Sequence, residues 1–121
     1  MARFDRIPPG EPRLLEGAAL FNAGEYFRSH EVWESLWHDV AGPDRACLQG
    51  LIQLAAAHHH LRYDNPSGAG YLYEQAKRNM APWRPDHAGI AMDPILAHLE
   101  AGLASFRAGQ KPAAPRIEIT A

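Results

Sequence analysis

The sequence predicts an all-α protein, a compact bundle of about five helices, and three observations support this fold class. Apolar residues recur with the 3.6-residue period of a helix through most of the chain, as in the stretch LQGLIQLAAAHHHL. No segment shows four or more alternations of β-branched and polar residues, the pattern of a half-buried strand. Prolines and glycines interrupt the periodic stretches where helices would end. The 121 residues fit a single domain with a core at about residues 12–107.

The first three helices are bracketed by glycine and proline. The first is expected over residues 12–23 and is followed by Gly24, and the second over residues 25–41, followed by Gly42. The third is expected over residues 44–63 and ends before a DNPSG turn. Because only a short turn joins the second and third helices, we expect them to form a central antiparallel hairpin.

The remaining chain predicts two further helices and an extended arm. The fourth helix is expected over residues 67–81, before the helix-breaking run PWRP. Asp93 is expected to cap the fifth helix, which stops near residue 108. Residues 108–121 are too rich in proline for a helix and predict an extended tail. Its apolar residues Ile117 and Ile119 could dock on the body of the protein or on a neighbouring subunit.

Composition excludes several classes of function. The net charge is -2, and the twelve Lys and Arg residues are scattered along the chain, so nucleic-acid binding is not expected. No apolar run approaches the roughly 18 residues of a membrane span, and the first residues lack the apolar core of a signal peptide, which predicts a cytoplasmic protein. Cys47 is the only cysteine, so a thiolate-rich metal site is excluded, and we expect a small buried apolar side chain there.

The stretch FNAGEYFRSHEVWESLW contains the main candidate site. It places His30 and Glu34 one helical turn apart within a run of large aromatic residues. At about 100° per residue, His30 shares a stripe with Tyr26, Trp33 and Trp37, so we expect it to point toward the core with Glu34 beside it. The pair could bind a metal, or it could be a hydrogen-bonded structural pair. The three aromatic residues are expected to belong to the core more than to a substrate platform.

The third helix adds a second histidine to this site. Its apolar face continues one turn further to His59, which we therefore expect to face inward, while His58 and His60 are expected at the rim. Gly50 in the middle of the same helix predicts a close approach of another helix.

The expected helical hairpin sets particular residues opposite one another. His30 would lie level with Gln53, and Glu34 with Gln49, whose amides could orient the imidazole or a ligand. His59 would be offset from His30 by roughly 9 Å along the helix axis, which a tilted crossing could reduce.

Together these residues resemble the DUF309 family of small helical proteins, whose signature is a histidine, a glutamate four residues later and a Trp or Tyr three beyond that. Here these are His30, Glu34 and Trp37. The segments FNAGEYFRSHE, LQGLIQLAAAHHH and NPSGA also resemble the family, so the similarity covers about residues 17–83. The resemblance implies a compact helical bundle and metal binding by the histidine and glutamate, without an established reaction. By their positions in the matching segments, the resemblance also implies that four further residues correspond to family positions: Glu31, Gln49, Gly50 and His59.

Two functions are therefore predicted as alternatives, and whether the protein is an enzyme stays open. The first is a non-enzymatic scaffold or interaction module, a homodimer, with His30 and Glu34 as a buried structural pair. It is favoured because the chain has no nucleophile triad, phosphate loop or dinucleotide fingerprint. The alternative is a metal-binding protein, with a metal-assisted hydrolase as its enzymatic form, holding one divalent transition metal (Zn, Mn or Fe) on His30, Glu34 and His59. The residues expected around either site are Tyr26, Glu31, Trp33, Trp37, Gln49 and Gln53.

Overall fold

A computed structural model describes residues 5–120 of the chain. Five helices dominate it, which confirms the all-α prediction: α1 (Pro12–Asn22), α2 (Tyr26–Trp37), α3 (Asp44–Arg62), α4 (Pro66–Met80) and α5 (Met92–Arg107). A single turn of 3-10 helix, η1 (Ala81–Trp83), follows α4. The two-residue strands β1 (Asp86–His87) and β2 (Ile90–Ala91) pair as an antiparallel hairpin that the sequence pattern did not predict.

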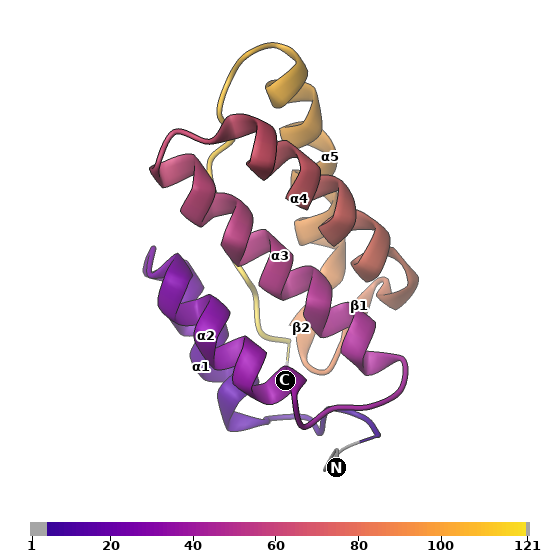
Figure 1. Cartoon of the computed structure of the whole chain (residues 1–121). Coiled ribbons are helices and arrows are strands. Elements are labelled where there is room, and N and C mark those ends of the chain that lie inside the picture. The colour runs from indigo at the N-terminus through magenta and orange to yellow at the C-terminus, as the bar shows by residue number, and fades with distance from the viewer. Residues whose placement is uncertain (1–4, 121) are drawn as a thin grey trace.

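Neighbouring helices in the chain are also neighbours in space (Figure 1). The central helix α3 runs across the front of the molecule with α2 on one side and α4 on the other, while α1 lies behind α2 and α5 behind α4. The predicted hairpin of α2 and α3 is present, and the chain after α5 returns behind α3 to end beside β2. Among the described residues, none of the helices combines the length and apolarity needed to span a bilayer.

Helix α1 is fastened to α2 by a close contact at Gly17. The Trp33 ring, fully buried, lies directly over this glycine, and its Nε1 donates a hydrogen bond to the Leu14 carbonyl oxygen at 3.1 Å. The Ser29 hydroxyl donates to the Gly17 carbonyl oxygen at 2.8 Å. Because Gly17 has no side chain, the indole ring of Trp33 can lie directly against the backbone of α1.

The predicted close approach at Gly50 is present between α3 and α4. A Cβ atom added to Gly50 would lie 2.5 Å from the Met80 side chain and 3.1 Å from the Ala76 carbonyl oxygen. Cys47 is buried as expected, and burial, followed by the nearby Asp44 carboxylate, raises the pKa of its thiol to about 12. The thiol therefore stays protonated at neutral pH.

Two helix ends differ from the prediction because side chains there bind elsewhere. Helix α2 ends at Trp37, four residues before the predicted end, and the following turn directs Asp39 to Arg13 at 2.9 Å. Helix α5 begins at Met92 with no side-chain cap, since the Asp93 carboxylate accepts a hydrogen bond from Arg84 Nε at 2.7 Å. Asp93 is thus not the predicted N-cap.

The tail is extended, as predicted, and it is part of the body of the protein. Ile117 is only 2% exposed and belongs to the hydrophobic core, while Ile119 forms an isolated antiparallel bridge with Ile90. Ile7, before the first helix, is also in the core. The core therefore extends beyond residues 12–107 at both ends, because segments outside the helices cover apolar surface that the five helices leave open.

Candidate functional site

His30 and Glu34 contact each other on the surface of α2. His30 Nε2 lies 3.4 Å from a Glu34 carboxylate oxygen, and the side chains are 29% and 48% exposed. The pair is therefore not buried, contrary to the structural-pair hypothesis. Helix α2 packs chiefly on α1 and α3, so part of its circumference remains in solvent. The other imidazole nitrogen, Nδ1, is shielded from solvent and has no hydrogen-bond partner within residues 5–120.

Glu34 also approaches a second histidine one turn later. His38 Nε2 lies 4.0 Å from the other Glu34 oxygen, and the His38 side chain is 65% exposed. Glu31, on the same side of α2, is exposed. The outer face of α2 therefore has two carboxylates, with histidines before and after them.

The motif residue Trp37 lies at one end of a shallow hollow between α2, α3 and α4. Its ring packs under the Arg45 guanidinium, 3.5 Å from the ring centroid, a close cation–π contact. The hollow has a volume of about 490 Å³, and Gln49 and Asn79 line its other side. Gln49 thus faces this hollow together with Trp37 and Arg45.

Gln53, the second predicted glutamine, is held by a neighbouring helix. Asn79 Nδ2 on α4 donates to its side-chain oxygen at 2.8 Å. This bond fixes the Gln53 amide between α3 and α4, so its role in the structure is to join these helices.

The predicted third ligand, His59, does not reach His30. The Phe27 ring lies between the two, with its centroid 6.2 Å from that of His30 and 5.4 Å from that of His59. His59 also packs against Tyr63, at 4.9 Å between centroids. Within residues 5–120, no group of three or more His, Cys, Asp or Glu side chains is arranged to hold a metal ion. His30 and Glu34 are therefore the part of the predicted ligand set that comes together.

The inward-facing histidine of α3 is His58, where the sequence pattern predicted His59. His58 is only 4% exposed, whereas His59 is half-buried. The prediction failed because α3 is covered on two sides, by α2 and by α4, so more than one stripe of the helix is buried. The spacing of Leu51, Leu54 and Leu61, all buried, includes His58 and could have identified it.

A buried polar pair that the sequence analysis missed connects α3 to α4. The Tyr73 hydroxyl is hydrogen-bonded to His58 Nε2. Burial lowers the pKa of His58 to about 4, with a smaller effect from His98, and burial raises the pKa of Tyr73. The histidine is therefore neutral and the tyrosine protonated at neutral pH. Tyr26 packs on His58, at 5.4 Å between ring centroids, so this half-buried tyrosine belongs with the interior pair.

The last predicted site residue, Trp33, is a core residue. It is fully buried against α1, whereas its neighbour in the chain, Glu34, is exposed. The expectation that it belongs to the core is met.

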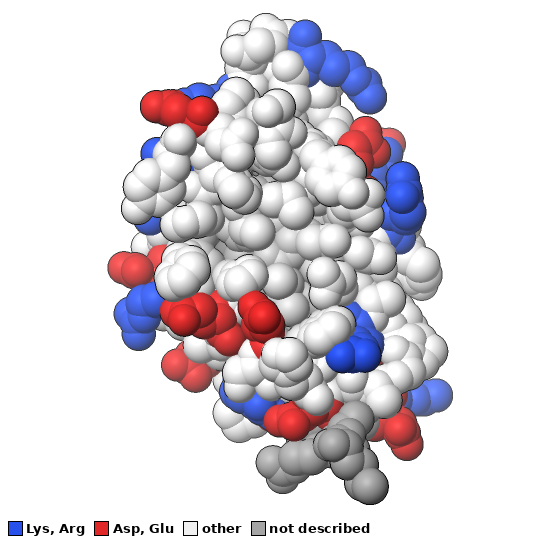
Figure 2. Space-filling view, in the orientation of Figure 1, with Lys and Arg blue, Asp and Glu red and all other residues white. Residues whose placement is uncertain are grey.

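The surface of α3 beside this face of α2 has no charged side chains over most of the length of the helix. Between Arg45 and Arg62 the chain contains no Asp, Glu, Lys or Arg. Figure 2 shows this as an uncharged band across the middle of the face formed by α3, with most charged side chains toward its periphery. At one end of the band, Phe27 is 54% exposed and Tyr63 is 70% exposed. We call the surface formed by Phe27, His30, His59 and Tyr63 the ring face.

The fold and this surface define a class of protein, a small helical bundle with a polar motif on an exposed helix. Residues 14–72 match the model of the family described as "Domain of unknown function (DUF309)". The crystal structure of a conserved hypothetical protein from Thermus thermophilus has a TM-score of 0.66 and 30% identity, covering 77% of this chain and 97% of that chain. The chain belongs to the DUF309 family.

A longer relative also contains this domain. An uncharacterized protein of Aquifex aeolicus (strain VF5) is 31% identical over 100 residues, which is 82% of this chain and 30% of that protein. This chain therefore spans less than a third of the length of that relative.

Proposed function

We propose that the protein is a non-enzymatic interaction module that pairs with a second copy of itself through the ring face. The observation that carries this proposal is the row of aromatic and imidazole rings with two large, exposed members, Phe27 and Tyr63. Exposed apolar surface next to a polar rim is typical of protein–protein contacts. The homodimer is part of this proposal, and the cytoplasmic location stays a prediction from the sequence.

A second copy is the favoured partner because the ring face carries no charged side chains of its own. A two-fold dimer brings the same patch of each subunit together, so like charges in the patch would repel. The ring face and the band of α3 beside it contain no Asp, Glu, Lys or Arg, which reduces this penalty, although the Glu34 carboxylate lies beside His30. The aromatic side chains of tyrosine and phenylalanine also bury a large apolar area in a contact at a small cost in side-chain entropy.

Substitution of Phe27 tests this proposal. We expect Phe27→Asp to weaken self-association at least tenfold, about 1.4 kcal/mol, because it places two carboxylates at the apolar contact. Sedimentation equilibrium of the wild-type and variant chains measures this. The matched control is Tyr71→Asp, since Tyr71 is similarly exposed, at 66%, but lies on α4 and lines a different hollow beside Phe106. A monomeric wild-type chain at high concentration, or equal loss in both variants, would contradict the proposal.

A second candidate function, metal binding, is favoured by the geometry of the motif itself. His30 Nε2 and a Glu34 oxygen are 3.4 Å apart on accessible side chains, a separation that a transition metal could bridge with modest side-chain adjustment. The residues supply two ligands, so any such metal would have open positions for water or a partner. Zn, Mn and Fe all suit an imidazole and a carboxylate.

Elemental analysis of untagged protein separates these two candidates. If the motif binds metal, we expect stoichiometric metal in the wild type, and its loss from both His30→Ala and Glu34→Gln, with folding checked by circular dichroism. His60→Ala on α3 is the control and should retain the metal. Metal that persists in Glu34→Gln would remove the carboxylate from the ligand set, and a metal-free wild type would exclude the second candidate.

A further inference from the structure

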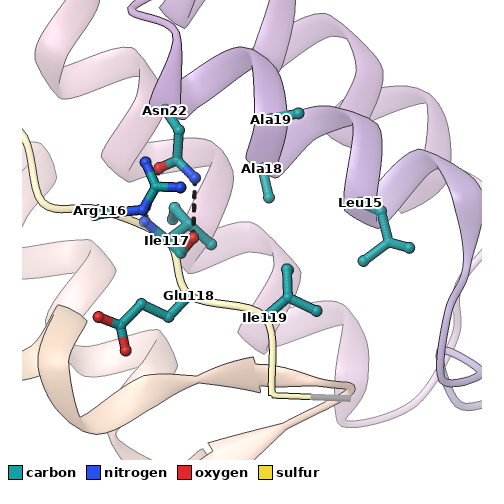
Figure 3. Close-up of a pocket in the computed structure, with 8 residues that line it drawn as sticks. All are labelled: Leu15, Ala18, Ala19, Asn22, Arg116, Ile117, Glu118 and Ile119. Atoms are coloured by element: carbon teal, nitrogen blue, oxygen red, sulfur yellow. Dashed lines mark hydrogen bonds between the residues drawn. The ribbon is translucent and has the colours of Figure 1, made fainter.

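A groove on another part of the molecule separates α1 from the C-terminal tail. Its larger section has a volume of about 660 Å³ and adjoins a second hollow of about 310 Å³. Both are lined by Asn22 and Arg116, so the two hollows adjoin at these residues. We call the larger one the arm groove. Leu15, Ala18, Ala19 and Ile119 give it an uncharged section on one side of Arg116 (Figure 3).

The wall formed by the tail is held in place. Asn22 Nδ2 donates to the Ile117 carbonyl oxygen at 2.9 Å, and the Ile117 amide donates to Asn22 Oδ1 at 2.8 Å. These two bonds join positions that are 95 residues apart in the sequence. Beyond them the Ala91 amide donates to the Glu118 carbonyl oxygen at 2.9 Å. The groove is therefore preformed by the fold, as small-molecule sites usually are.

Arg116 supplies the positive charge of the groove. Its guanidinium lies beside the Asn22 side chain (Figure 3), and it forms no salt bridge with a carboxylate among residues 5–120. A guanidinium with free donors in a concave site favours a carboxylate, which it can bind through two parallel hydrogen bonds.

We propose that the arm groove binds a small monocarboxylate with an aliphatic tail. The carboxylate binds Arg116, and the tail lies along Leu15, Ala19 and Ile119. The volume lies in the range of ordinary ligand sites, and the small Ala19 side chain leaves room on the surface of α1.

The second charged residue of the groove narrows the class of ligand. Glu118 also lines it, and its carboxylate points away from Asn22 (Figure 3). A ligand with a second negative charge on its head group would lie near this carboxylate, which disfavours phosphate esters. The far carboxylate of a dicarboxylate would instead lie against the uncharged section, where it would lose hydration without gaining a partner, which disfavours dicarboxylates. The site is independent of the ring face, so its failure would leave the proposed function untouched.

Titration calorimetry with octanoate tests the inference. We expect octanoate to bind the wild-type protein with a dissociation constant of about 1 mM or lower, and octanol and the dicarboxylate suberate to bind at least tenfold more weakly. Arg116→Gln should weaken octanoate binding at least tenfold, and Ala19→Trp, which fills the uncharged section, should do the same. Arg107→Gln is the control, since Arg107 is exposed at the end of α5. No octanoate binding, or unchanged binding in Arg116→Gln and Ala19→Trp, would overturn the proposal.

Discussion

Gly17→Ala is expected to destabilise the protein by about 3 kcal/mol, the upper part of the range for overpacking a core. The added Cβ atom would lie 2.1 Å from Trp33 Nε1. The ring has little freedom to move, because it is fully buried and its Nε1 is bound to the Leu14 carbonyl oxygen. The two helices must therefore separate or the indole must lose its hydrogen bond. Urea unfolding followed by circular dichroism measures the change in the free energy of unfolding.

Gly70→Ala is the matched control for this substitution. Gly70 is also a helical glycine, but a Cβ atom there would be no closer than 3.8 Å to the nearest atom, in Phe106. We expect this variant to be unchanged or more stable by about 0.5–1 kcal/mol, because alanine favours the helix. If Gly17→Ala left the free energy of unfolding unchanged or raised it, this result would contradict the close contact between α1 and Trp33.

Acid is expected to destabilise the fold through His58, by up to about 3 kcal/mol between pH 6.5 and pH 4. The pKa of this histidine is lowered from 6.5 to about 4, chiefly by burial and then by His98. Because the folded state binds the proton more weakly than the unfolded state, this loss of stability is absent above pH 6.5 and complete below pH 4. Tyr73 and Tyr26 also face His58, and in the protonated imidazole Nε2 can only donate in its hydrogen bond with the Tyr73 hydroxyl.

Comparing the pH dependence of the free energy of unfolding in the wild type and in His58→Gln separates the titration of His58 from that of the carboxylates. His58→Gln keeps a hydrogen-bonding group near Tyr73 but cannot titrate, so its free energy of unfolding should fall less than that of the wild type over this pH range. His38→Gln is the control, since the His38 side chain is 65% exposed, and it should retain the wild-type profile. Parallel profiles for the wild type and His58→Gln would contradict the burial of a neutral histidine.

Much of the fold could be predicted from local patterns. Helix positions follow from the 3.6-residue period, and the turns from glycines and prolines such as Gly24 and Pro43, because these depend on neighbouring residues in the chain. The close packing at Gly50 was also predictable, since glycine within a helix is costly unless another helix needs the space. The short hairpin Asp86–Ala91 was missed because its strands are too short to show alternation.

The candidate site was predicted in part. His30 and Glu34 meet because helical geometry alone brings residues four apart into contact. Their exposure, and the separation of His59 by Phe27, depend on how α2 and α3 are rotated against each other. A ligand set inferred separately from the apolar stripes of two helices could not include this rotation.

The sequence by itself therefore determined the helices, the family and the pairing of His30 with Glu34, since each rests on residues close together in the chain. Only the tertiary structure decided which histidine of α3 is buried, because α2 and α4 cover that helix from two sides. It also created the arm groove, by joining Asn22 to Ile117 across 95 positions. Contacts of this length depend on the packing of the whole chain, and no local spacing of residues encodes them.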